Sequence, residues 1–173
     1  MSATRLIIIV PALMTLFAAP APGAAEPAKN WRPPAGEIRA QALSNAIMAT
    51  HPELLSVTFH GTPPGAAKIY TMFAGSYPER IGNPDDPDDI DVIVKGITII
   101  DPRWRRSDPV KKFVVQMPLR DARGANVGLI VFAFKLGADG HRSEGYYFAA
   151  AARMRDRLSR EIASYAGLFA PAK

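Results

Sequence analysis

Hydrophobic and polar residues alternate over residues 54–60, and this pattern predicts a β-strand with one apolar face. Leu55, Val57 and Phe59 fall on one side of the strand, and Ser56, Thr58 and His60 fall on the other. Before it, apolar residues recur at helical spacing over residues 35–50, which predicts an amphipathic helix that ends at His51-Pro52. After it, Thr62-Pro63-Pro64-Gly65 must turn, because prolines cannot continue a strand ladder. A second strand, antiparallel to the first, is predicted over residues 68–74.

The segment that follows has the pattern of a helix start. Asp86 suits the N-cap position and Pro87 the first helical position, while Asp88 and Asp89 complement the helix dipole in the first turn. Gly96 is expected to end the helix, because glycine is common just after the last helical residue. A short helix is therefore predicted over residues 87–95, and residues 98–100 form a short third strand.

The second half of the chain predicts a hairpin and a helix. Residues 112–120 and 125–135 are rich in β-forming residues and flank Asp121 to Gly124, with Gly124 in the left-handed conformation. Phe113, Met117 and Phe132 are expected in the core. A last helix is predicted over residues 144–166, with one apolar face made by Ala151, Met154, Leu158, Ile162 and Tyr165. The order of elements predicts an α+β fold, an antiparallel sheet of about five strands with long helices at both ends.

The N-terminus predicts export. Arg5 precedes an apolar run from Leu6 to Phe17, and small residues and prolines follow, which is the order of a secretory signal peptide too short to span a membrane. We expect cleavage near Ala25/Glu26, and hence a signal peptide over 1–25, a Pro-rich linker over 26–34 and a single domain over 35–168. The mature protein is expected in the periplasm or secreted, without a transmembrane span.

Composition narrows the classes of function. The chain has no cysteine, which excludes disulfides, thiolate zinc sites and covalent c-type haem attachment. The formal net charge is +5, or about +4 once Arg5 leaves with the signal peptide. Because no nucleic-acid-binding motif accompanies this charge, we interpret it as a solvated or membrane-facing basic surface and expect no nucleic-acid partner.

Several of these motifs together resemble the extracytoplasmic PAS-like sensor domains of the Cache group. The motifs are the segment PDDPDDIDVIVKG before a strand, and the hairpin with Met117-Pro118-Leu119, the turn Asp121 to Gly124 and Val127-Gly128-Leu129. The resemblance covers roughly residues 35–165. Cache domains mostly sit between two membrane spans of a receptor, whereas this chain shows no second span. The resemblance therefore implies a soluble sensory or accessory binding protein for a small polar or anionic ligand, with a membrane receptor or transporter as a candidate partner.

The resemblance also implies where a ligand would bind. In such folds the ligand lies between one sheet face and the helix-loop region after the second strand, which here points to His60, Tyr70, Met72 and Asp89 as ligand-binding residues. Arg80 or Lys68 near the pocket mouth could serve an acidic ligand. Most of the Asp85–Asp89 cluster is explained by the helix start, and it lacks the spacing of an EF-hand.

Three alternatives remain open, and the cofactor is unknown. His60 with Asp85 or Asp89 could hold a divalent metal ion. His60 or His51 could ligate a haem, while His51 and His141 are otherwise expected to be exposed. An interaction subunit that docks on a membrane receptor is the third alternative. We expect no enzymatic activity, because no nucleophile elbow, cysteine or phosphate-binding loop is present.

Overall fold

A single antiparallel sheet organises the molecule. In the computed structural model, which describes residues 27–101, 107, 109–136 and 142–172, five strands lie in the order β2-β1-β5-β4-β3. The strands are β1 (Leu54–Gly61), β2 (Thr71–Gly75), β3 (Ile99–Asp101), β4 (Lys112–Arg120) and β5 (Asn126–Lys135). Every neighbouring pair is antiparallel. The predicted α+β fold, with an antiparallel sheet of about five strands, is confirmed.

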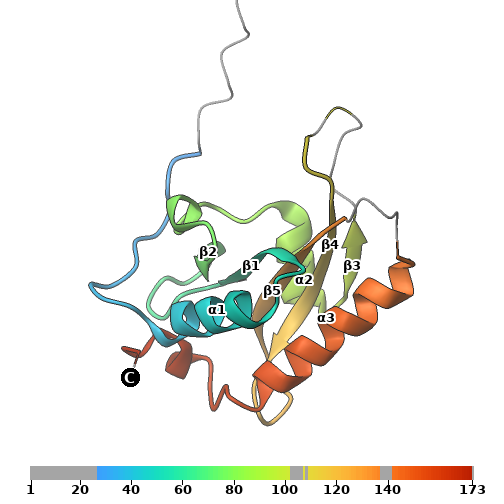
Figure 1. The fold of residues 1–173 in the computed structure, drawn as a ribbon. Helices are drawn as coiled ribbons and strands as arrows, with labels where there is room; N and C mark the ends of the chain where they lie inside the picture. Colours follow the sequence, from blue (N-terminus) through green and yellow to red (C-terminus); the bar gives the residue numbers. More distant parts are fainter. Residues whose placement is uncertain (1–26, 102–106, 108, 137–141, 173) are drawn as a thin grey trace, which may run out of the picture.

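The helices divide between the two faces of the sheet (Figure 1). Helix α1 (Arg39–Thr50) packs on β1 and β2, and helix α3 (Glu144–Ser159) packs mainly on β4. The short helix η1 (Pro78–Arg80) and helix α2 (Pro87–Lys95) belong to the connection from β2 to β3, and α2 contacts β5, β4 and β1. The main hydrophobic core lies under α1 and α3, whereas the connection with η1 and α2 covers a more polar sheet face.

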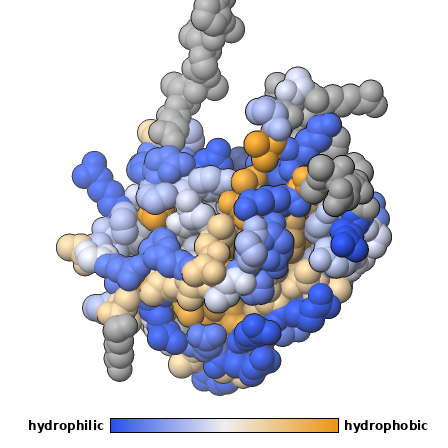
Figure 2. All heavy atoms as spheres, viewed as in Figure 1, coloured by the Kyte–Doolittle hydropathy of each residue, from blue (hydrophilic) through white to orange (hydrophobic). Residues whose placement is uncertain are grey.

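The strand alternation places different residues on these two faces. The core side includes Phe59, Phe73, Met117 and Phe132, each at most 1% exposed, and Phe113 at 8%. The expected core positions Phe113, Met117 and Phe132 are confirmed. In the view of Figure 2, hydrophilic residues cover much of the surface, with smaller hydrophobic areas between the elements. Among the described residues, no helix is long and apolar enough to cross a membrane.

Two predicted strands differ in detail from the structure. Strand β2 begins at Thr71 instead of residue 68, because Lys68 adopts a left-handed φ of 66° that a strand cannot accommodate. In β1, Leu54 is buried in the core while Leu55 is only half-buried. An irregularity in the pairing with β5 between Leu54 and Ser56 shifts the alternation at this point.

The last helix is shorter than predicted. It ends at Ser159, not near residue 166, and a turn leads to the short helix η2 (Ala166–Phe169). Ile162 and Tyr165 still pack in or against the core, but from this irregular segment. The carbonyl of Ile162 accepts the N–H of Ala122 at 2.8 Å, which attaches this segment to the β4–β5 turn.

Both ends of the described chain are attached to the domain. Asn30 N–H donates to the carbonyl of Gly82 at 2.8 Å, and Lys29 Nζ donates to the carbonyl of Ile81 at 2.8 Å. Near the C-terminus, Ala172 N–H donates to the carbonyl of Glu37 at 2.9 Å. The predicted signal peptide, with its cleavage site near Ala25/Glu26, lies outside the described residues, as does His141.

Candidate functional site

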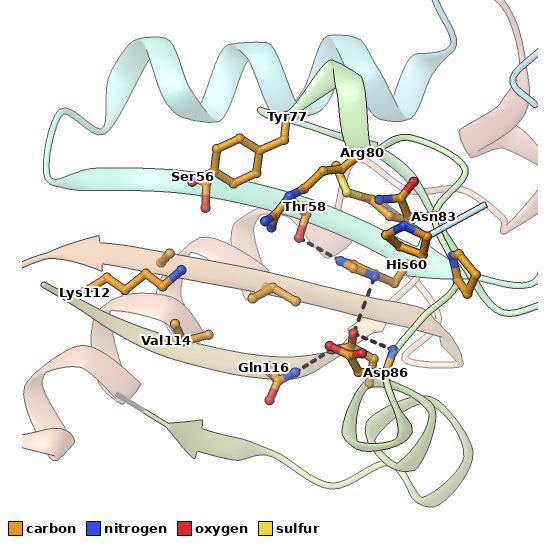
Figure 3. Close-up of a pocket in the computed structure, with 16 residues that line it drawn as sticks. Ser56, Thr58, His60, Tyr77, Arg80, Asn83, Asp86, Lys112, Val114 and Gln116 are labelled. Carbon is orange, nitrogen blue, oxygen red and sulfur yellow. Dashed lines mark hydrogen bonds and ion pairs between the residues drawn. The ribbon is translucent and has the colours of Figure 1, made fainter. Parts of the chain in front are cut away.

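A cavity of about 320 Å³ lies between the polar sheet face and the η1–α2 connection (Figure 3). The sheet contributes alternate residues of three central strands, because only every second side chain of a strand points to this face. Lys112, Val114 and Gln116 come from β4, and Val131 and Ala133 from β5. The wall opposite the sheet carries mainly polar side chains. The sheet side also includes Ser56, Thr58 and His60 of β1 and Met72 of β2. The lining residues outside the sheet are Pro27, Tyr77, Arg80, Asn83, Pro84, Asp86 and Asp89.

The His60 imidazole is held at both ring nitrogens. Nε2 lies 2.8 Å from Thr58 Oγ1, its neighbour on the same strand face, and Nδ1 lies 2.8 Å from Asp85 Oδ1. Asp89 Oδ2 is 4.0 Å from the same Nδ1. The side chain of His60 is 11% exposed and that of Asp85 is completely buried. His60 therefore connects the cavity surface to a buried carboxylate.

Asp85 reaches His60 because the chain before α2 is attached to strand β2. Thr71 forms an isolated antiparallel bridge with Pro84, and its Oγ1 donates to the carbonyl of Asn83 at 2.9 Å. The N–H of Asp85 donates to the carbonyl of Tyr70 at 3.1 Å. These bonds fix the backbone leading into Asp85, whose carboxylate then lies against His60.

Asp89 has two structural roles at the start of α2. It forms a capping box with Asp86, whose backbone N–H donates to Asp89 Oδ2 at 3.3 Å. Its other oxygen, Oδ1, accepts a hydrogen bond from the Gln116 side chain on β4. The predicted helix bounds, the N-cap at Asp86 and the left-handed Gly96 are confirmed.

The pKa values of His60 and Asp89 are both raised, for different reasons. Burial alone would lower the pKa of His60, but the hydrogen bond to Asp85 and the negative charges of Asp85, Asp89 and Asp86 outweigh burial and raise it. Burial raises the pKa of Asp89, and the charge of Asp85 adds to this effect while His60 opposes it. In this environment the imidazolium form of His60 is favoured, with Nδ1–H donating to Asp85.

The arrangement Thr58–His60–Asp85 has the order of a nucleophile, a base and an orienting acid. A general base must be neutral to accept a proton, and here the acidic neighbours favour the charged imidazolium. The geometry thus suits hydrogen-bond donation and charge pairing better than activation of the Thr58 hydroxyl.

Two cations enter the cavity from its other side. Arg80 extends from η1 and Lys112 from β4, and both point into the cavity in Figure 3. The guanidinium of Arg80 lies 5.1 Å from the centre of the Tyr77 ring. In the part of the chain that the structure describes, neither Arg80 nor Lys112 forms an ion pair. Two positive side chains thus face this cavity, and neither has an ion-pair partner among the residues that the structure describes.

The structure brings together three of the four residues predicted to bind ligand. His60, Met72 and Asp89 line the cavity, whereas Tyr70 does not and contributes its carbonyl to Asp85. Arg80 lines the cavity and Lys68 does not. His51 is partly exposed, with Nδ1 2.9 Å from Glu53 Oε1.

Sequence reasoning missed the contribution of β4. Lys112, Val114 and Gln116 alternate with the core residues Phe113, Val115 and Met117, and a fully buried glutamine within such a strand is unusual. The alternation of Lys112, Val114 and Gln116 with core residues could therefore have indicated that the opposite face of β4 lines a site.

Two groups of side chains have metal-ligand atoms within 4.8 Å of one another. One is His60, Asp85 and Asp89, and the other is Asp86, Asp88 and Asp89. The first group is largely buried and combines an imidazole with two carboxylates. The second consists of three carboxylates at the start of α2, which range from exposed to buried.

Comparison with known proteins identifies no family by sequence. No protein-family model matches the chain, and no match is found among curated proteins. Among solved structures, the chain is similar to the sensor domain of DcuS from E. coli, with a TM-score of 0.36 and 17% identity over 69% of this chain and 72% of that chain. It is also similar to the periplasmic domain of RsbU from Chlamydia trachomatis, with a TM-score of 0.40 and 17% identity over 59% of this chain and 37% of that chain.

Proposed function

We propose that this domain is exported and binds a small polar or anionic ligand in the cavity, as a sensory or accessory binding protein. The observation that carries the proposal is the presence of Arg80 and Lys112, two cations that point into the cavity without an ion-pair partner among the described residues. A carboxylate between them would gain charge-assisted hydrogen bonds.

The rest of the cavity would orient such a ligand. His60, Thr58 and Asn83 offer polar atoms, while Met72 and Val131 provide apolar contact. Ligand sites commonly combine an apolar lining with a few polar groups that fix orientation, and a cavity of about 320 Å³ suits a small molecule. His60, Met72 and Asp89 are therefore the proposed contacts on the sheet and α2 side.

A thermal-shift screen of the protein against organic acids and amino acids tests this function. A ligand at 100 times its dissociation constant stabilises the folded state by about 2.7 kcal/mol. Arg80→Ala and Lys112→Ala should each weaken binding of the best acid. Arg153→Ala and Lys68→Ala are matched controls, because both residues are exposed outside the cavity lining. Failure of all acids to stabilise the protein would argue against the proposal, as would equal effects of control and cavity variants.

Export is tested separately, by expressing the complete chain in a bacterium and sequencing the N-terminus of the protein in the periplasm or medium. We expect an N-terminus near Glu26, because small residues precede it at the cleavage positions. Retention of the intact chain in the cytoplasm would contradict this part of the proposal.

A further inference from the structure

A compact group of three potential metal ligands borders the cavity, and its role goes beyond binding an organic ligand. From its geometry, we propose that His60, Asp85 and Asp89 bind a divalent transition-metal ion such as Zn²⁺ or Mn²⁺. The imidazole comes from β1, Asp85 from the segment before α2, and Asp89 from the first turn of α2.

The distances among the ligand atoms are close to those that an ion requires. His60 Nδ1 lies 2.8 Å from Asp85 Oδ1 and 4.0 Å from Asp89 Oδ2. Ligand atoms bound tetrahedrally at zinc–nitrogen and zinc–oxygen distances near 2.0–2.1 Å lie about 3.3 Å apart. A small outward shift of Asp85 and inward shift of Asp89 would form the site. The ion would take the place of the proton between Nδ1 and Asp85, which would leave to solvent.

The groups around these ligands are those that usually orient a metal site. A ligating histidine generally donates its other ring N–H to a hydrogen-bond acceptor, and Nε2 of His60 lies 2.8 Å from Thr58 Oγ1. The carboxylate of Asp89 is likewise held through Oδ1 by Gln116 on β4. This leaves His60 Nδ1 and Asp89 Oδ2 on the side that faces Asp85.

The burial of Asp85 is an independent observation that favours a cation at this position. Its side chain is completely buried, and Oδ2 is a buried oxygen without a hydrogen-bond partner. A buried carboxylate oxygen with no donor is costly, and metal coordination is one of the ways in which proteins compensate buried charge. A single imidazolium balances only one of the two carboxylates, whereas a divalent ion balances both.

The chemistry of the ligands selects the class of ion. Calcium takes six to eight oxygen ligands, so a site with a histidine and only two carboxylates suits it poorly. Imidazole together with carboxylates suits zinc or manganese. His60 and Asp89 line the cavity, so the remaining coordination positions would open toward it.

Isothermal titration of ZnCl₂ and MnCl₂ into the metal-stripped protein, without a histidine tag, tests this proposal. We expect one ion per chain and a weakening of at least about tenfold in His60→Gln and Asp89→Asn. His51→Gln and Asp91→Asn are the matched controls and should bind as the wild type does. His51 is part of an exposed pair with Glu53, and Asp91 pairs with Lys95 on the outer side of α2.

A second measurement does not depend on how the variants fold. In the wild-type protein, paramagnetic Mn²⁺ should broaden the imidazole NMR signals of His60 at concentrations that leave those of His51 sharp. Absence of any binding would overturn the proposal, and so would binding that His51→Gln abolishes and His60→Gln leaves intact. If a chelator is added to the organic-acid screen, the result of that screen is independent of metal binding, so the two proposals can fail separately.

Discussion

The side-chain amide of Gln116 on β4 donates a hydrogen bond to Oδ1 of Asp89 on α2. Gln116 is completely buried and Asp89 is 6% exposed. The same carboxylate accepts the backbone N–H of Asp86, so one residue both caps the helix and attaches it to the sheet. The start of α2 is therefore joined to the wall of the cavity by a contact between residues 27 positions apart in the chain.

Replacement of Gln116 by leucine should destabilise the domain, because it leaves a buried carboxylate oxygen without its donor. Loss of a hydrogen bond to a charged group, with one partner left buried, costs about 1–3 kcal/mol. Urea unfolding monitored by circular dichroism measures the change.

The matching control changes both partners of this hydrogen bond, Gln116 and Asp89. In the double variant Gln116→Leu/Asp89→Asn, the penalty should be smaller than the sum of the two single changes, since the side chain that lost its donor no longer carries a charge. Strict additivity of the two single effects would show that the contact contributes little.

Sequence reasoning located α2 well because the information is local. Asp86, Pro87 and Gly96 act on their own turns, and the predicted bounds 87–95 match the structure. The end of the last helix was wrong for the opposite reason. Ile162 and Tyr165 continue the apolar spacing of α3, but the chain leaves the helix before them, and the Ile162 carbonyl accepts the N–H of the distant residue Ala122.

In the candidate site, too, local features could be predicted from the sequence and distant contacts could not. The alternation of β1 placed His60 with Thr58 on the polar face, and the two side chains are in contact. The identity of its buried partner could not be predicted, because Asp85 is one of several nearby aspartates. Bonds from Thr71 and Tyr70 decide which of them reaches His60.

A side chain that fills the cavity should abolish ligand binding without destabilising the fold. Ala133 is 4% exposed and lines the cavity, so Ala133→Phe places an aromatic ring in open space. We expect little change in the unfolding midpoint and loss of stabilisation by the best organic acid in the screen. Ala67→Phe introduces the same side chain at an exposed position and should leave binding unchanged. Normal binding by Ala133→Phe would place the ligand elsewhere.

Gly128 permits the close approach of β5 to His60. Its φ is 133°, and a Cβ at this position would lie 2.5 Å from the His60 carbonyl oxygen. Gly128→Ala should therefore combine backbone strain with a clash against backbone atoms, at a cost of about 1–3 kcal/mol for the strain alone. Thermal unfolding measures the loss of stability.

Gly124→Ala is the comparison for this change. Gly124 has a φ of 83° in the β4–β5 turn, but an added Cβ would meet nothing within 4 Å. Its effect should be restricted to backbone strain and thus be smaller. Equal destabilisation by the two variants would contradict the role assigned to the contact with His60.

Asp121 in the β4–β5 turn should make stability depend on pH in the acid range. Burial would raise the pKa of this carboxyl, but the N–H groups of Ala125 and Arg123 and the charge of Arg123 outweigh it and hold the pKa below its usual value. The two backbone bonds to Oδ1 measure 3.0 and 2.9 Å. Because the folded-state pKa is depressed, the stabilisation is present above the unfolded-state pKa and is lost as the pH falls through the folded-state pKa.

Asp121→Asn tests this dependence. The variant should unfold at a lower temperature than the wild type at pH 7, because the amide carries no charge for the turn N–H groups and Arg123. The difference between the two proteins should shrink as the pH falls below about 4, where the unfolded carboxyl takes up a proton. Glu161→Gln, at an exposed position, serves as the control and should show no such trend. A wild-type advantage that is constant from pH 7 to pH 3 would mean that the carboxylate charge does not stabilise the turn.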